Sequence, residues 1–356
     1  MKFTLKWLRE YLDFDCSIIE LSEALTRIGL EVENVNNPYE DLKNFTICEI
    51  KKITKHPNAD KLKICIVNNG REDLQIICGA NNVRKNLKTV LAPVETVLPS
   101  KNQSNGMKIK KSVIRGVESF GMLCSAEELC LETDSNGIIE IDDNKKVGTS
   151  YLDCADEELI TIEIAITPNR PDCAGVFGIA KDLVALGLGK FKEQDKINLE
   201  EEVSTPIKLK NNLKDSDCPQ FLLRLIKNVK NKNSSEDLVK RFNATGIKVI
   251  SALVDVTNFL TFDRCRPLHV FDYDKIDGDI VIRHSFDGEK FKGLDGIEYE
   301  LLSGMIVICD DSGIISLAGI MGGERTSCDF DTNNVLVESA FFMPEKIAWA
   351  GRKLAI

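Results

Sequence analysis

His269 is one of three histidines in this 356-residue chain, and it lies among other side chains that could do chemistry. Its stretch reads DVTNFLTFDRCRPLHVFD, residues 255–272, and Pro267 stands two positions before it. The imidazole is the side chain whose ordinary pKa lies closest to neutral pH, so His269 is a candidate for orienting a water molecule or a substrate. A histidine at a strand edge whose ring is satisfied by nearby groups is the alternative.

A single carboxylate interrupts the apolar run VLVESAFF, residues 335–342. In a strand, Glu338 shares a face with Leu336 and Ala340. On a buried face it is a desolvated hydrogen-bond acceptor, and on an exposed face it is an ordinary glutamate that pairs with a cation. The glycines of SLAGIMGGE, residues 316–324, either let the backbone approach a ligand or mark a bulge or turn. We find no triad of nucleophile, base and acid.

Positive charge gathers in one part of the chain. Between Lys51 and Arg115 there are fourteen Lys or Arg and four acids, a net +10, which leaves −20 for the rest of a chain of formal charge −10. Such asymmetry is typical of a surface that binds a polyanion, and a solvated basic face without a partner is an equally open interpretation. We expect His56, which lies in this stretch, to be an exposed loop or strand-end residue without a chemical role.

Length and composition indicate a protein of several domains in a reducing compartment. A chain of 356 residues with 43% hydrophobic content can bury two or three cores. Its twelve cysteines form no C-x-x-C pair, so we expect no zinc or thioredoxin-type site. Acidic residues follow the start too soon for a secretory signal, and no run of about 18 apolar residues could span a bilayer. We therefore expect a cytoplasmic protein with no membrane contact.

The elements that must position these residues follow from periodicity. Ser17 and Glu20 have the spacing of a capping box before an amphipathic helix that ends at Gly29. Short apolar runs separated by turn residues from 45 to 125 predict a small antiparallel barrel. A second helix is predicted with Asp172 as its N-cap and Gly187 as its end. A polar linker over 192–206 and a mixed α+β region from about 221 follow, with Pro344 opening the final helix.

Arg170, in TPNRPD, has two interpretations. The two prolines of that segment keep the backbone extended next to a helix start, where a phosphate could bind. We favour the other interpretation, in which Arg170 ties the turn to its own domain.

Several motifs together resemble one family. HPNADKLKICIVNNG, QIICGANNV and RGVESFGMLCS resemble the tRNA-binding barrel of the bacterial-type phenylalanyl-tRNA synthetase beta chain, of methionyl-tRNA synthetases and of related free-standing proteins. MKFTLKWLREYLDF, ALTRIGLEVENV and TPNRPDCAGVFGIAKDLVAL resemble the beta chain on either side of that barrel, and methionyl-tRNA synthetases lack these flanks. DVTNF, CRPLHVFD, SLAGIMGGE and VLVESAFF resemble the motifs of the beta chain's editing domain.

The resemblance implies an α+β multidomain fold. A small α/β N-terminal domain would comprise residues 1–38 and 152–195, with an OB-fold tRNA-binding barrel inserted at 39–151. An α+β editing domain would follow at 205–356, incomplete at its C-terminal end, because the beta chain of the family continues far beyond this length. The last helix runs to the final residue without a cap or a polar tail, which agrees with that expectation.

The resemblance also implies site residues. The catalytic candidates are His269, Glu338, Thr257 and Asn258, and the substrate-binding candidates are Pro267, Ala318, Gly319, Met321, Gly322 and Gly323. The candidates for tRNA binding, which would attract phosphate without reading sequence, are Lys51, Lys52, Lys61, Lys63, Lys108, Lys110, Lys111 and Arg115. The sequence departs from the family at Cys265 and Arg266, which replace the usual Gly and Gln.

As a function, the resemblance implies tRNA binding and hydrolytic editing of mischarged tyrosyl-tRNA(Phe). Aminoacylation, with ATP and magnesium, would be carried by an alpha subunit, in an assembly of two alpha and two beta chains. No phosphate-binding loop is present in this sequence, and we expect no metal or cofactor on this chain and no aminoacylation by it alone. The alternative is a non-catalytic scaffold that docks RNA and assists assembly.

Overall fold

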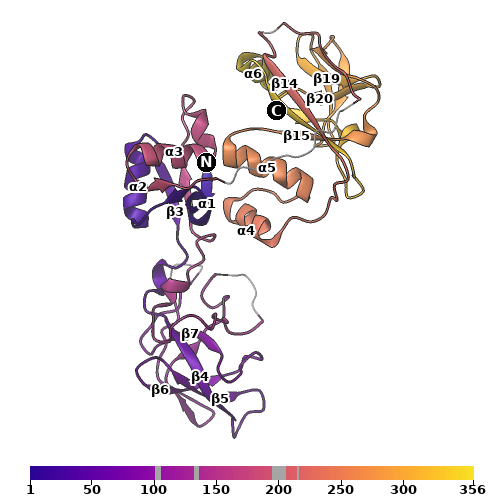
Figure 1. The fold of residues 1–356 in the computed structure, drawn as a ribbon. Helices are drawn as coiled ribbons and strands as arrows, with labels where there is room; N and C mark the ends of the chain where they lie inside the picture. Colours follow the sequence, from indigo (N-terminus) through magenta and orange to yellow (C-terminus); the bar gives the residue numbers. More distant parts are fainter. Residues whose placement is uncertain (101–105, 132–135, 195–205, 215) are drawn as a thin grey trace. The chain divides into compact units, whose positions relative to one another are not determined.

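The chain divides into two compact units in the computed structural model (Figure 1), which describes residues 1–100, 106–131, 136–194, 206–214 and 216–356. The first unit comprises Met1–Asn34 and Ile162–Ile356, and the second, Val35–Thr161, is inserted between these two segments. The three domains predicted from the sequence are a finer division, and their boundaries stay a prediction. Most of the predicted linker, residues 195–205, lies outside the described residues.

The inserted unit is a nearly closed antiparallel barrel. Its sheet has the order β10-β7-β4-β5-β6, with β4 (Thr46–Lys55), β5 (Lys63–Asn68), β6 (Asp73–Cys78), β7 (Lys88–Ala92) and β10 (Met122–Leu123). The chain just before β10 also bonds to β6, because the Phe120 amide donates to the Gln75 carbonyl (2.9 Å) and the Ile77 amide donates to Ser119 Oγ (3.1 Å). A short hairpin, β8 (Ser112–Ile114) and β9 (Val117–Ser119), packs beside β6. The barrel and the mixed α+β content predicted from the sequence are confirmed.

His56 is buried, which corrects the expectation that it is exposed. Its side chain anchors the loop after β4 to the β8–β9 hairpin, because Nε2 lies 3.0 Å from the Ile114 carbonyl oxygen and Nδ1 accepts from the Asn58 amide (3.1 Å). Periodicity could not show this, since the partner carbonyl lies 58 positions further along the chain.

Two short sheets organise the N-terminal segment and the residues after the barrel. β1 (Lys2–Thr4), β11 (Thr161–Ile164) and β3 (Val32–Asn36) form one sheet, and β2 (Leu12–Asp13) pairs with β12 (Lys190–Phe191). Helices α1 (Leu5–Arg9), α2 (Ile18–Arg27) and α3 (Val176–Ala185) cover them. The capping box of Ser17 and Glu20 is confirmed at the start of α2.

The predicted N-cap of the second helix is wrong. α3 begins after Gly175, whereas Asp172 lies in the 3-10 turn η3 (Pro171–Ala174). The Asp172 carboxylate pairs with Arg170, whose Nη2 lies 3.0 Å from Oδ2. Arg170 also pairs with Asp182 of α3, so it ties the turn to its own domain, as favoured from the sequence.

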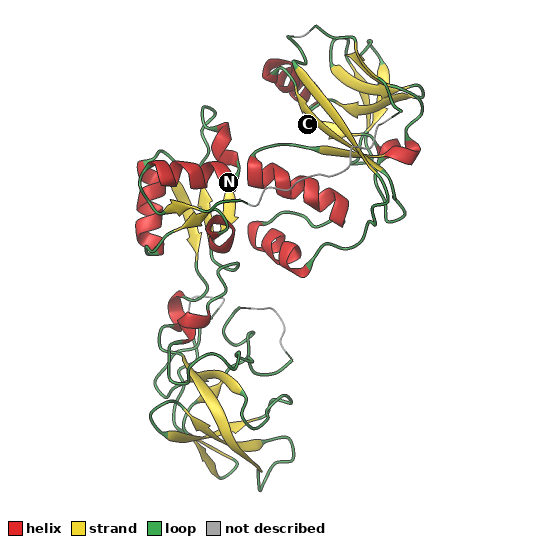
Figure 2. Cartoon of the chain, in the orientation of Figure 1, coloured by secondary structure: helices red, strands yellow, loops and turns green. Residues whose placement is uncertain are grey.

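The described residues of the remainder of the first unit form a five-stranded sheet, a three-stranded sheet, a two-stranded hairpin and three helices. Figure 2 distinguishes these strands and helices by colour. The five-stranded sheet comprises β13 (Leu209–Asn211), β16 (Ile280–His284), β19 (Ile306–Asp310), β20 (Gly313–Leu317) and β21 (Met321–Gly322), in that order. The three-stranded sheet has the order β14-β22-β15, with β14 (Gln220–Ile226), β22 (Val335–Phe341) and β15 (His269–Asp272). Phe271, Ile308 and Leu336 belong to the shared core of these sheets.

The helices α4 (Glu236–Thr245) and α5 (Ala252–Arg264) precede β15, and α6 (Pro344–Leu354) ends the chain with Pro344 in its first turn, as predicted. A hairpin of β17 (Glu289–Lys292) and β18 (Glu298–Leu301) and the 3-10 turns η4 (Tyr273–Lys275) and η5 (Glu324–Thr326) complete this part. In the inserted unit, the 3-10 turns are η1 (Glu40–Leu42) and η2 (Tyr151–Cys154).

Helix α5 packs against the N-terminal segment. Asp263, 1% exposed, accepts hydrogen bonds from Trp7 Nε1 (2.8 Å) and Tyr11 Oη (2.6 Å). Phe259 stacks on Trp7 with ring centroids 5.4 Å apart, and Arg241 of α4 pairs with Glu10. The DVTNF motif, which forms the middle of α5, therefore belongs to a helix that joins two distant parts of the chain.

Candidate functional site

A cavity of about 670 Å³ lies beside the three-stranded sheet. One wall is the chain from Cys265 through His269, and a second is the face of β22 that carries Glu338 and Ala340. The other lining residues come from β20 and β21 with their turn, from the end of β22 and from α6: Ser316, Gly319, Ile320, Met321, Gly322, Phe341, Phe342, Pro344, Ile347 and Ala348. Its size is within the range for a small organic ligand.

His269 and Glu338 oppose each other across two neighbouring strands. β15 and β22 are antiparallel, and His269 is the direct register partner of Glu338. Residues directly opposite in an antiparallel pair have Cβ atoms about 4.5–5.5 Å apart and point to the same face. Both side chains line the same cavity. The structure thus brings together the two residues that the sequence singled out for chemistry.

Burial changes the titration of both groups. Glu338 is 6% exposed, and desolvation raises the pKa of its carboxyl to about 7. Within the described part of the chain, no hydrogen bond or ion pair reaches that carboxyl. Desolvation lowers the pKa of the His269 imidazole to about 4, and Phe271 lies edge-on to the ring at a centroid distance of 4.4 Å. At neutral pH the imidazole is uncharged and the Glu338 carboxyl is partly ionised, and its ionised form is a strong acceptor without a partner among the described residues.

Gly322 makes room for His269. A Cβ on Gly322 would overlap the imidazole ring at Cε1 and Nε2, so any larger residue there would displace the histidine. The sequence left open whether these glycines let the backbone approach a ligand or mark a bulge or turn, and at Gly322 the nearest group is the side chain of His269. The glycine sets the position of the imidazole.

The structure does not bring every predicted site residue into the cavity. Pro267, Gly319, Met321 and Gly322 line it, whereas Ala318 and Gly323 do not. The Gly323 amide donates to the Ile315 carbonyl (2.7 Å), which holds the turn together.

Thr257 and Asn258 lie on α5 and are not among the lining residues. The Thr257 hydroxyl donates to the Val254 carbonyl (2.7 Å) within the helix. Their predicted substrate contacts therefore stay a prediction.

Sequence reasoning missed two parts of the lining. Ser316, 4% exposed, presents a hydroxyl that donates to the Met321 carbonyl (3.1 Å) and retains lone pairs for a ligand. Helix α6 contributes Pro344, Ile347 and Ala348. A single serine in an apolar strand is only a weak indication of a binding site. The sequence also does not show that this amphipathic helix faces the cavity rather than the rest of the core.

The departure from the family at Cys265 falls at a left-handed residue. Cys265 caps α5 with φ 53° and ψ 40°, a conformation that costs roughly 1–2 kcal/mol for a residue with a Cβ and little for glycine. The neighbouring Arg266 donates from Nε to Ser339 Oγ (3.1 Å), which attaches the turn to β22. The turn is strained but retains its contact with the strand that carries Glu338.

We expect Cys265→Gly to raise the free energy of unfolding by about 0.5–1 kcal/mol, because glycine adopts φ > 0 without strain while losing some chain entropy on folding. Urea unfolding of both proteins measures the change. Cys265→Ala, which removes the thiol but keeps the Cβ, is the control and should show no such gain. An equal gain in both variants would show that the thiol, not the backbone, is the source.

The predicted tRNA-binding residues all belong to the barrel unit, but their charges are not equally available. Lys51 pairs with Glu49 (2.7 Å), Lys108 with Glu95, and Lys111 with Glu118 (2.8 Å). Lys63 Nζ donates to the Val83 carbonyl (3.2 Å).

Some other basic side chains of the barrel unit are not engaged in ion pairs with described residues. Lys52, Lys61 and Lys110 are exposed and have no ion-pair partner among the described residues. Arg115 lies next to Asn58, whose Nδ2 donates to the Arg115 carbonyl (3.0 Å). Lys108 and Lys110 are exposed on either side of buried Ile109.

An acidic cluster outside the cavity is already neutralised. Asp172, Cys173 and Asp182 place their ligand atoms within 4.8 Å of one another, which would suit a metal ion. The Arg170 guanidinium pairs with both carboxylates. The twelve cysteines are all free thiols.

Comparisons with known proteins match two parts of the chain to domain families. Residues 45–150 match the tRNA-binding domain family, and residues 217–356 match the B3/4 domain family. The phenylalanine–tRNA ligase beta subunit of Rhodopseudomonas palustris is 48% identical over 359 residues, covering 100% of this chain and 44% of that protein. That of Paramagnetospirillum magneticum is 47% identical over 359 residues, again covering 100% and 44%. The chain thus spans less than half the length of these relatives.

A solved structure adds a weaker likeness. An N-terminal fragment of the phenylalanyl-tRNA synthetase beta subunit from Pyrococcus horikoshii is 18% identical, covers 55% of this chain and 60% of its own, and has a TM-score of 0.33. That score is too low to support a statement about the fold.

A tRNA-binding barrel joined to a B3/4 domain, with relatives of this identity along the whole chain, defines an aminoacyl-tRNA synthetase chain. Within that class, the chain belongs to the family of the phenylalanine–tRNA ligase beta subunit. Among the described residues, no helix is long and apolar enough to cross a bilayer.

Proposed function

We propose that the cavity between His269 and Glu338 hydrolyses tyrosyl-tRNA(Phe), and that the barrel helps to hold the tRNA. The single observation that carries the proposal is Glu338, a carboxylate that is 6% exposed, lines a cavity of ligand size and has no partner among the described residues. An isolated charge in such a place lowers stability, so we infer that it serves a ligand. A phenolic hydroxyl is a donor that fits this acceptor.

The selectivity would come from desolvation. A synthetic site shaped for phenylalanine cannot strongly reject tyrosine, which only adds a hydroxyl, whereas a second site that requires a hydrogen bond can reject the analogue that lacks it. Phenylalanine would leave the Glu338 carboxylate buried and unpaired, which costs about 1–3 kcal/mol or more. Correctly charged tRNA would thereby escape hydrolysis.

The hydrolytic step needs positioning more than activation, because an aminoacyl ester is already reactive. Water adds to the ester carbonyl, the bond from the carbonyl carbon to the ribose oxygen breaks, and tyrosine and a free ribose hydroxyl result. With a pKa of about 4, His269 is a weak base at neutral pH, so its role would be to orient the water by a hydrogen bond. The hydroxyl of Ser316 is close enough to the same cavity to contact the substrate.

The partners belong to the same proposal. The exposed lysines of the barrel would neutralise tRNA phosphates, and an alpha subunit would carry aminoacylation with ATP and magnesium, in the cytoplasm. The metal-ligand-type cluster found among the described residues, Asp172, Cys173 and Asp182, does not suit magnesium, because Arg170 pairs with both carboxylates.

Hydrolysis of mischarged tRNA tests the proposal. The purified 356-residue chain should release tyrosine from tyrosyl-tRNA(Phe) faster than buffer does, and His269→Ala and Glu338→Ala should each reduce that rate at least tenfold. Phenylalanyl-tRNA(Phe) is the matched substrate control. Release of tyrosine no faster than in buffer, or at the same rate in all three proteins, would contradict the proposal. It would favour the alternative of a scaffold that docks RNA through the barrel and assists assembly.

A further inference from the structure

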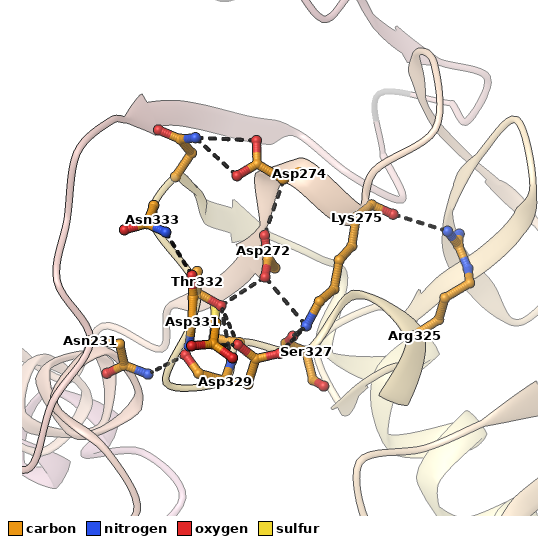
Figure 3. Close-up of polar contacts among 12 residues, drawn as sticks. Asn231, Asp272, Asp274, Lys275, Arg325, Ser327, Asp329, Asp331, Thr332 and Asn333 are labelled. Carbon is orange, nitrogen blue, oxygen red and sulfur yellow. Dashed lines mark hydrogen bonds and ion pairs between the residues drawn. The ribbon is translucent and has the colours of Figure 1, made fainter.

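Figure 3 shows a cluster of polar side chains around Asp272, and the register places Asp272 at the opposite end of β15 from His269 and its partner Glu338. Asp272 is the last residue of β15 and is 4% exposed. Its Oδ2 accepts from Thr332 Oγ1 (2.7 Å) and lies 3.3 Å from Lys275 Nζ, while its Oδ1 accepts from the Asp274 amide (3.1 Å). Three groups from two chain segments thus converge on one buried carboxylate.

The same cluster folds the segment that leads into β22. Lys275 Nζ also donates to Asp329 Oδ2 (2.6 Å) and to the Ser327 carbonyl (2.8 Å). The Asp329 amide donates to Thr332 Oγ1 (2.9 Å), so this hydroxyl lies between Asp329 and Asp272. The Asn231 side chain, which comes from the chain before α4, donates to the Asp329 carbonyl (2.8 Å). The cluster therefore fixes where β22 begins.

Register carries this anchor to the cavity. Asp272 pairs with Val335, and His269 pairs with Glu338, three residues further along both strands. Because side chains alternate along a strand, a shift of one residue would turn Glu338 to the other face and Ser339 toward the cavity. Such a shift would return a buried carboxylate to water, so the burial of Glu338 itself opposes the native register. The burial of Leu336 on the same face and the pairing of β22 with β14 favour the native register, and the polar cluster at the start of β22 adds to them.

We propose that Asp272, Lys275 and Thr332 form a positioning cluster, which holds β22 in the register that sets Glu338 opposite His269. This inference rests on the proposed function for its role in editing, but the placement of Glu338 is a property of the chain and can be measured without activity. None of the three residues touches the cavity, so they act through Glu338 and are positioning residues.

The test removes one hydroxyl and keeps the shape. In Thr332→Val, the Asp272 carboxylate loses one of its donors and the Asp329 amide loses its acceptor, whereas Thr332→Ser keeps both bonds. The first readout is the titration of the Glu338 carboxyl, which carbon NMR of the protein with labelled glutamate measures. The signal that is lost in Glu338→Gln is assigned to Glu338. We expect the pKa to fall from about 7 toward its ordinary value in Thr332→Val and to return in Thr332→Ser.

The second readout is hydrolysis. In Thr332→Val the KM for tyrosyl-tRNA(Phe) should rise three- to tenfold with a smaller change in kcat, because the acceptor for the phenol is displaced while the ester is still reached. Glu289→Gln is the stability control. It weakens the two-bond pair with Arg283 (2.7 and 2.9 Å) in the same domain but outside the cavity, and it should lower the melting temperature without moving the titration or KM.

The outcomes separate the two proposals. If Thr332→Val lowers the melting temperature as Glu289→Gln does, but leaves both the Glu338 titration and KM unchanged, the positioning role is overturned. If the titration moves and no protein hydrolyses the ester, positioning stands and the proposed function fails. Lys275→Met, which removes the ion pairs with Asp272 and Asp329 but keeps the Thr332 bond, provides the same readouts if Thr332→Val does not fold.

Discussion

Glu338→Gln is expected to make the protein more stable in mildly alkaline buffer while it impairs the selection of tyrosine. The folded-state pKa of about 7 lies above the ordinary value of 4.5, so the folded chain holds this proton more tightly than the unfolded chain does. Glu338 therefore costs no stability below about pH 4.5, and stability is lost as the pH rises toward and through 7. A change of this size corresponds to about 3 kcal/mol as an upper value.

Urea unfolding at several pH values measures this effect. The difference in unfolding free energy between Glu338→Gln and the unchanged protein should be near its minimum at pH 4.5 and reach up to about 3 kcal/mol in favour of glutamine at pH 8. The neighbouring titratable groups do not change their charge near pH 7. Burial lowers the pKa of His269 to about 4, and burial together with the Glu338 charge raises the pKa of Cys218 to about 11, so neither titrates near 7.

The same variant should lose selectivity. Glutamine keeps the shape and an amide oxygen but not the charge, and a hydrogen bond to a charged acceptor is about twice as strong as one to a neutral acceptor. We expect the ratio of kcat/KM for tyrosyl- over phenylalanyl-tRNA(Phe) to fall about 5- to 150-fold, which corresponds to about 1–3 kcal/mol. In the unchanged protein this ratio should rise with pH through about 7, as the carboxyl ionises.

Glu300→Gln, at an exposed glutamate of β18, is the matched control and should change neither stability nor selectivity with pH. A stability difference for Glu338→Gln that does not depend on pH would mean that this carboxyl does not titrate as an isolated buried group. An unchanged selectivity ratio would remove Glu338 from the recognition of the phenol.

The second large effect concerns salt. If three to five exposed basic groups of the barrel each neutralise one phosphate, the log-log slope of tRNA affinity against salt should be about −2 to −4.5, so affinity falls roughly 20- to 500-fold between 50 and 200 mM. Fluorescence anisotropy with labelled tRNA(Phe) measures this slope. Substituting Lys52, Lys61 and Lys110 together by alanine should reduce the slope by about 2 to 3.

Lys227, Lys230 and Lys232 provide a control with the same loss of charge, because they are exposed and lie outside the barrel unit. Their triple substitution by alanine should change the slope much less. An equal change in both triple variants would mean that net charge alone governs binding, and a flat salt response of the unchanged protein would point to a use of the barrel other than RNA binding.

Local patterns predicted the elements well because each depends on residues close in sequence. The capping box of Ser17 and Glu20 starts α2, and the apolar spacing from Val176 to Leu183 buries one face of α3. Short apolar runs with turn residues between them were enough to predict a barrel. The prediction of Asp172 as the N-cap was wrong, since α3 begins after Gly175 and the Asp172 carboxylate pairs with Arg170. Local spacing does not show such a pairing.

The site was predicted less completely because it depends on distant pairing. Resemblance to the family supplied His269 and Glu338, but their direct opposition follows from the register of two strands separated by more than sixty residues. Ser316 and helix α6 join the lining through packing that no local period encodes. Thr257 and Asn258 stand in a motif, yet a helix turns successive side chains around its axis, so proximity in sequence to His269 does not bring them to the cavity.

The contacts of α5 have a consequence for how this part of the protein can be divided. The B3/4 match starts at residue 217, but Phe259 and Asp263 within it find their ring and donor partners in Trp7 and Tyr11, near the first residue of the chain. Residues 217–356 expressed alone would carry an aromatic surface open to water and a carboxylate deprived of two donors. The boundary drawn by sequence similarity is thus not a boundary of cooperative unfolding, and heat should melt both ends of this unit together.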